Sequence, residues 1–104
     1  MKFTKIIMMV AAVLALAAAS AQAAGDKGKG QGAYMANCIA CHNMDPAKDG
    51  AVGPAIKGAS RELIEARVIK AVYPAGYKPK RTTKLMPPMP HLAGSIDDLA
   101  AFLK

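Results

Sequence analysis

Two cysteines and a histidine in close spacing constrain this chain more than any other feature of its sequence. The segment Cys38-Ile39-Ala40-Cys41-His42 contains both cysteines of the 104 residues. With two residues between them, one helical turn presents both sulfurs to the same side, and the next residue supplies an imidazole. This spacing is typical of c-type haem attachment, in which each thiol adds to one vinyl group and the histidine ligates the iron. We therefore expect one covalent haem c, with iron as its metal.

Two other kinds of site use a pair of cysteines at this spacing. A zinc site would need two more good ligands, and His42 and His91 are the only histidines of the chain. His42 is also poorly placed to join both sulfurs around one tetrahedral ion, because it follows Cys41 directly. A thioredoxin-like thiol pair needs strands that alternate with helices, and no convincing strand pattern is present. We favour the haem interpretation and keep the other two as alternatives.

The N-terminal segment predicts export. Its first five residues carry two lysines, residues 6–19 are an unbroken apolar run, and small residues precede a cleavage site after Ala23. As a helix, this run would span about 21 Å, against about 30 Å of membrane hydrocarbon. We expect residues 1–23 to be a cleaved signal peptide and residues 24–104 to form one domain in the periplasm. No stable membrane insertion is expected after cleavage.

The positive charge of the chain is concentrated in one stretch. The formal net charge is +7, and no acidic residue occurs between Ala66 and Ile96. Nucleic acid is an implausible partner outside the cytoplasm, whereas an acidic protein fits this charge. The alternative is a solvated basic face that only keeps the protein soluble. The basic residues of the stretch are Arg67, Lys70, Lys78, Lys80, Arg81 and Lys84.

Hydrophobic periodicity predicts a helix on each side of a loop. A glycine- and lysine-rich lead-in over residues 24–32 is expected to tighten into a helix from about Gly32 through Cys41. Residues 43–53 are punctuated by proline and glycine and are expected to form a loop. Ser60 is a predicted N-cap for a second helix over residues 61–72. Its expected apolar stripe consists of Ile64, Val68, Ala71 and Val72.

The last third of the chain predicts a long loop and a short closing helix. Residues 73–90 contain five of the seven prolines and therefore cannot form a regular helix. Long loops in small domains are often functional. Ser95, followed by two aspartates, is a capping-box-like start of a last helix. One side of that helix would be lined by Ile96, Leu99, Ala100 and Leu103. The fold class that follows is all-α.

The order of these features resembles the class I, monohaem cytochromes c. The CxxCH motif is followed by a Gly-Pro pair at Gly53, a middle helix, a Met-Pro pair at Met86 and a short closing helix. The resemblance covers essentially all of residues 24–104. It implies a small all-α cytochrome c fold, with about three helices and loops wrapped around one haem. It also implies that Tyr34 and Phe102 pack the first helix against the last.

The resemblance implies a role for five residues. Cys38 and Cys41 would hold the haem by thioethers, and His42 would be the proximal ligand of the iron. The carbonyl of Pro54 would accept the other ring N–H of His42 and fix its orientation. Met86 would place its thioether on the opposite face of the haem.

Two other residues compete with Met86 for the distal position. Met89 precedes one proline, whereas Met86 precedes two, as in the usual Met-Pro pattern of the family, and is therefore favoured. His91 would instead give ligation by two imidazoles and a lower potential. Both methionines could also be packing residues, because methionine commonly fills gaps in apolar cores.

Ligation by a histidine and a methionine implies electron transfer. With both axial positions filled, no substrate can reach the iron, so we expect a periplasmic one-electron carrier and not an enzyme. The alternative is a haem c subunit of a larger periplasmic oxidoreductase, for example one that oxidises sulfur compounds. An open distal site in a sensor is a third hypothesis. The expected partner is an acidic redox protein or a membrane oxidoreductase that docks at a basic haem edge formed by Lys70, Lys78, Lys80, Arg81 and Lys84.

Overall fold

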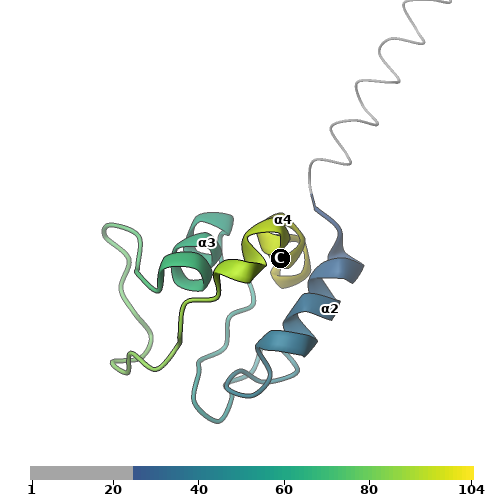
Figure 1. Cartoon of the computed structure of the whole chain (residues 1–104). Coiled ribbons are helices and arrows are strands. Elements are labelled where there is room, and N and C mark those ends of the chain that lie inside the picture. Colours follow the sequence, from purple (N-terminus) through teal and green to yellow (C-terminus); the bar gives the residue numbers. More distant parts are fainter. Residues whose placement is uncertain (1–24) are drawn as a thin grey trace, which may run out of the picture.

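The described part of the chain is an all-helical domain. The computed structural model describes residues 25–104, so the predicted signal peptide lies outside the described residues. Within this range there are three α-helices and one 3-10 helix, with no strand (Figure 1). None of the helices described is long and apolar enough to cross a membrane. The elements are α2 (Lys27–Asn37), α3 (Arg61–Lys70), η1 (Pro90–Ser95) and α4 (Ile96–Leu103).

Helix α2 begins earlier and ends earlier than its sequence pattern indicates. The expected lead-in is already helical from Lys27, because the side chain of Asp26 caps the helix by accepting the N–H of Lys29 at 2.9 Å. The helix ends at Asn37 and does not include the cysteines. The predicted bounds of about 32–41 were therefore wrong at both ends.

Close packing of α2 on α4 explains why a glycine-rich segment is helical. A β-carbon on the buried Gly30 would clash with the backbone carbonyl oxygen of Asp98 in α4. Glycine lowers helix propensity, but here it lets two helices approach closely. Next to this crossing, the rings of Tyr34 and Phe102 have their centroids 5.3 Å apart. The predicted packing of the first helix against the last is confirmed.

Helix α3 begins at the predicted residue but ends two residues before the predicted end. The hydroxyl of Ser60 accepts the N–H of Leu63 at 3.1 Å, which confirms the N-cap. The helix stops at Lys70 because Ala71 adopts a left-handed conformation with φ of 54°. Because of this change, Val72 does not continue the apolar stripe of the helix and is 50% exposed. Of the predicted stripe, Ile64 and Val68 are buried.

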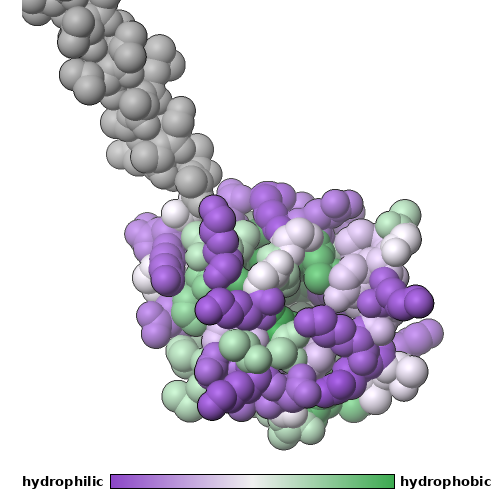
Figure 2. All heavy atoms as spheres, turned by 180° about the vertical axis from the view of Figure 1, so that it is seen from behind, coloured by the Kyte–Doolittle hydropathy of each residue, from purple (hydrophilic) through white to green (hydrophobic). Residues whose placement is uncertain are grey.

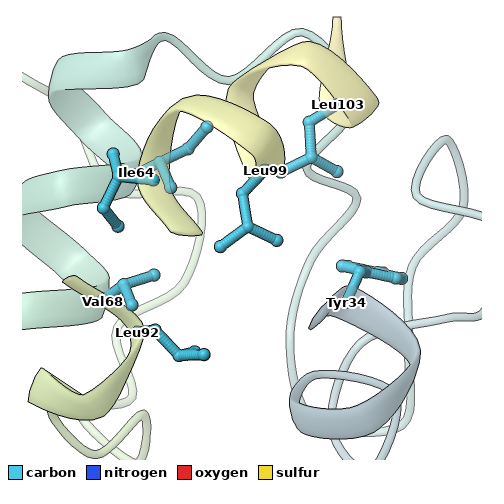
Figure 3. Packing of buried hydrophobic residues seen from close by; sticks show 7 residues of the cluster. Tyr34, Ile64, Val68, Leu92, Leu99 and Leu103 are labelled. Carbon is cyan, nitrogen blue, oxygen red and sulfur yellow. The ribbon is translucent and has the colours of Figure 1, made fainter. Parts of the chain in front are cut away.

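The core gathers beneath α4. The expected cap at Ser95 is absent, since its side chain makes no capping hydrogen bond and η1 runs directly into α4. Figure 3 shows Leu99 pointing between the side chains of α3 and η1 on one side and Tyr34 of α2 on the other. The buried cluster consists of Tyr34, Ile64, Val68, Leu92, Ile96, Leu99 and Leu103.

Two long connections lie on the same side of the helices in Figure 1. We call residues 38–60 the first connection and residues 71–89 the second connection. Seen from behind, hydrophilic side chains cover much of the surface, with apolar atoms visible between them (Figure 2). Among the described residues, the large apolar side chains that are most exposed all lie in these connections: Ile39, Met44, Val52, Val72, Tyr73 and Leu85. Most of the exposed apolar surface of the described part is therefore in its loops.

Candidate functional site

The cysteine motif forms a single tight turn directly after α2. Cys38 caps the helix, with its N–H bonded to the carbonyl of Tyr34 at 2.9 Å. The carbonyl of Cys38 then accepts the N–H of Cys41 at 3.2 Å and that of His42 at 2.9 Å. No disulfide joins the two cysteines, of which Cys38 is half-buried and Cys41 exposed, and burial raises the pKa of the Cys38 thiol. The turn brings the two thiols and the imidazole into one short segment.

The imidazole of His42 is held by the first connection. Its Nδ1 lies 2.9 Å from the carbonyl oxygen of Pro54, which is the contact that the family resemblance implies. A carbonyl can only accept a hydrogen bond, so in the neutral ring Nδ1 carries the proton and Nε2 has a lone pair for a metal. A hydrogen bond of this kind orients the ring and increases its donor strength.

Gly53 allows the backbone to approach this ring. A β-carbon at Gly53 would overlap the Cε1, Nδ1 and Nε2 atoms of His42. The N–H of Gly53 also donates to the carbonyl of Cys41 at 2.9 Å, so the loop folds back onto the cysteine turn. The sequence marks Gly53 only as part of a Gly-Pro pair, and its steric role requires the three-dimensional structure.

Tyr34 fixes the chain that follows His42. Its hydroxyl donates a hydrogen bond to the carbonyl of Asn43, and its side chain is fully buried. Burial is the main cause that raises the pKa of Tyr34, with smaller contributions from Cys38 and Asp45. This bond could not be predicted from the sequence, because it joins the side chain of a helix to the backbone of a loop.

The three residues considered as distal ligands have different surroundings. Met86 lines an open hollow of about 250 Å³ together with residues of α3 and the second connection. Met89 is fixed through its backbone N–H, which donates to the carbonyl of Val68 at 2.6 Å. The Nε2 of His91 lies 3.3 Å from Oδ1 of Asn37, and His91 is exposed. The other residues that line the hollow are Arg67, Ala71, Tyr73 and Lys84.

These residues fit a covalently attached haem better than a zinc ion. Two thiols and an oriented imidazole occupy one turn, and the backbone of Gly53 lies directly against the ring of His42. Exposed apolar side chains flank the turn in the first connection, where a large apolar group could cover them. Within residues 25–104, no three histidine, cysteine or acidic side chains gather in a way that could hold a metal ion. A protein-only zinc site therefore has no support.

The class of this protein follows from the family that its sequence matches. The sequence model of the cytochrome c family matches residues 28–104. The chain belongs to the cytochrome c family. Membership implies an electron-transfer haem protein with covalent haem c, and the two cysteines of this cytochrome fit a single haem-binding motif. Searches of curated proteins and of solved structures returned no match.

Some basic side chains of the second connection make polar contacts within the molecule. Lys80 donates from Nζ to the carbonyl of Ala55 at 2.8 Å, and Nη2 of Arg81 lies 3.3 Å from Oδ2 of Asp49. Two of the five residues expected to form a docking patch are therefore engaged within the molecule. No hydrogen bond or ion pair to another described residue involves the side chains of the other three: Lys70, Lys78 and Lys84.

An aromatic stack forms the start of the second connection. The rings of Tyr73 and Tyr77 are stacked with centroids 5.4 Å apart and planes 11° apart. The guanidinium carbon of Arg67 in α3 lies 4.1 Å from the centroid of the Tyr73 ring. This cation–π contact attaches the beginning of the second connection to α3.

Proposed function

We propose that this cytochrome is an exported one-electron carrier whose haem c is ligated by His42 on one face and by Met86 on the other. The observation that carries the proposal is the His42–Pro54 pair, in which Nδ1 is engaged at 2.9 Å and Nε2 stays free for iron. This imidazole directly follows the two thiols that would hold the haem. Membership of the cytochrome c family supports the electron-transfer role.

The protein's own residues set the chemistry of such a site. When bound, the haem supplies one electron at a time as its iron changes between the ferrous and ferric states. The Met86 thioether would favour the ferrous state and raise the potential, whereas the Pro54 carbonyl keeps His42 oriented. If His42 and Met86 both ligated the iron, no position on it would remain for a substrate. This ligation would favour a carrier over an enzyme.

The proposed docking surface combines basic and apolar side chains of one segment. Val72 and Leu85 are exposed by 50% and 69%, and Tyr73 by 36%. The unengaged lysines of the same stretch give it a positive field that an acidic redox protein or a membrane oxidoreductase would complement. We place the contact in the periplasm because of the predicted signal in residues 1–23. The lysines of this surface are Lys70, Lys78 and Lys84.

The exposed apolar residues of this surface also favour a second candidate function. Val72 and Leu85 could be covered permanently if the chain were the haem subunit of a larger periplasmic oxidoreductase. The two functions differ in how tightly the surface is held. A carrier would exchange electrons in a transient contact that weakens with salt, whereas a subunit would stay associated at high ionic strength.

A pair of matched variants tests the ligand assignment. Met86→Leu and Met89→Leu each remove one sulfur while nearly preserving side-chain volume. We expect the ferric haem-loaded Met86→Leu protein to lose the weak far-red sulfur-to-iron band and to bind carbon monoxide when reduced. Met89→Leu should behave like the wild type. Loss of the band in Met89→Leu alone would assign the ligand to Met89, and a wild-type spectrum in both variants would exclude both methionines.

A further inference from the structure

Two basic side chains of the second connection reach across to the first. Lys80 Nζ donates to the carbonyl of Ala55 at 2.8 Å, and the N–H of Ala55 donates to Oδ1 of Asp49, also at 2.8 Å. The other oxygen of Asp49, Oδ2, lies 3.3 Å from Nη2 of Arg81. Both backbone polar groups of Ala55 and both oxygens of Asp49 are therefore engaged, and the contacts form a closed circuit between the two connections.

This circuit lies between the segments that carry the two proposed ligands. Ala55 directly follows Pro54, whose carbonyl holds the ring of His42. On the other side, Arg81 precedes Met86 in the same stretch of the second connection. A force that moves one segment is transmitted to the other through these few contacts.

The second connection has few other polar contacts near Met86. Within the described residues, the nearest backbone–backbone hydrogen bonds of this segment are donated by Tyr77 and Met89. Three residues of the stretch 78–88 are prolines, which have no N–H to donate. The contacts of Lys80 and Arg81 are the hydrogen bonds and ion pairs that tie this stretch to the rest of the described chain.

We propose that Asp49, Lys80 and Arg81 form a latch that positions the second connection and so keeps the Met86 sulfur at the iron. The proposal rests on the proposed function, because it takes Met86 as the ligand. The three side chains are positioning residues that act through Ala55 and through the residues that precede Met86. Hydrogen bonds from Ala55 and Arg81 lower the pKa of Asp49, so its carboxylate is charged and the latch is formed at neutral pH.

The latch should affect local opening more than global stability. Asp49 and Arg81 have exposed side chains, and exposed ion pairs contribute little to the folding of a whole domain. The free energy of opening a loop is much smaller than the free energy of unfolding the domain. The same ion pair therefore contributes a larger fraction of the free energy that keeps this segment closed. Loss of the ion pair should increase the open population of the second connection about two- to fivefold.

The test uses the haem-loaded protein and the rate at which cyanide replaces the distal ligand of ferric iron at low ionic strength. Asp49→Asn, Arg81→Gln and the double variant remove the ion pair. Lys57→Gln is the matched control, because it removes one positive charge near the circuit from an exposed side chain that makes no hydrogen bond or ion pair with another described residue. We expect each single variant to raise the rate about two- to fivefold, the double variant to add little more, and the control to match the wild type.

Amide hydrogen exchange of Ala55 and Met89, whose N–H groups are bonded to Oδ1 of Asp49 and to the carbonyl of Val68, gives a second readout in the same proteins that does not depend on iron ligation. Faster exchange in Asp49→Asn and Arg81→Gln, but not in Lys57→Gln, would support the latch. Unchanged exchange and cyanide rates, or equal changes in the control, would overturn it. If the wild-type iron already has an open position, the proposed ligation fails, and the exchange data alone decide whether the latch exists.

Discussion

The imidazole of His42 occupies the space that a β-carbon of Gly53 would need. Gly53 is buried, and its N–H is bonded to the carbonyl of Cys41, so the backbone has little freedom to move away. The next residue, Pro54, supplies the carbonyl that holds the ring. One loop therefore sets both the position and the hydrogen bonding of the proposed proximal ligand.

Substitution Gly53→Ala should disturb this arrangement. The added methyl group must displace either the ring or the loop, and overpacking of this kind costs about 1–3 kcal/mol. We expect a lower free energy of unfolding for the haem-loaded protein and a smaller fraction of the protein with attached haem. Chemical denaturation and the haem-to-protein absorbance ratio measure these two quantities.

Gly32→Ala is the control for that substitution. Gly32 lies in α2, and a β-carbon there meets no atom within 4 Å. Because alanine favours a helix, this variant should be as stable as the wild type or more stable, by up to about 1 kcal/mol. Equal stabilities of the two variants would mean that Gly53 has no steric role.

The crossing of α2 and α4 depends on Gly30. In Gly30→Ala, the new side chain would meet the carbonyl of Asp98 and Cβ of Phe102, so the two helices must separate. We expect a loss of about 1–3 kcal/mol in the free energy of unfolding, with weaker contact between Tyr34 and Phe102. Denaturation monitored by tyrosine fluorescence tests this, again with Gly32→Ala as the comparison. A stability equal to that of Gly32→Ala would contradict the close crossing.

Acid should release the contacts of Asp49. The N–H of Ala55 and then Arg81 hold the pKa of this carboxyl below its ordinary 3.8, with Lys80 adding a smaller charge effect. A lowered folded pKa means that the stabilisation is fully present above about pH 3.8 and is lost as the pH falls through the folded value. The stability difference between wild type and Asp49→Asn should therefore shrink in this acid range. A difference that is independent of pH would contradict the assignment.

The unengaged lysines should steer anionic partners. In Lys70→Gln/Lys84→Gln, electron transfer to an anionic oxidant such as ferricyanide should slow about two- to tenfold at low salt. The rate with a cationic oxidant should not fall. Lys27→Gln/Lys29→Gln in α2 is the matched control for net charge. If both double variants slow the anionic reaction equally, the effect comes from net charge and the docking surface is not where we place it.

Local signals in the sequence predicted the start of the second helix, the haem-binding motif and the class of fold. The N-cap at Ser60 acts through a bond three residues away, so its effect could be read directly from the sequence. The packing of Tyr34 on Phe102 followed from the family resemblance. The family itself was also predicted, because the spacing of Cys38, Cys41 and His42 depends on residues adjacent in the chain.

Contacts between distant residues account for what the sequence did not show. The start of α2 has a local cap at Asp26, but the close packing of Gly30 against Asp98 is a contact that no local propensity reveals. Likewise, Arg81 was predicted to be a docking residue because its own stretch has no acid, yet its partner Asp49 lies in another loop. The missing cap at Ser95 reflects η1, which no sequence pattern predicted and which runs directly into α4.

The absorption spectrum of the exported, haem-loaded protein tests the central claim most directly. It would be recorded in the ferric state and then in the ferrous state with and without carbon monoxide. Ligation by His42 and Met86 predicts a weak far-red sulfur-to-iron band and a ferrous spectrum that carbon monoxide does not change. Absence of the band together with ready binding of carbon monoxide would mean an open iron and would contradict the electron-carrier account.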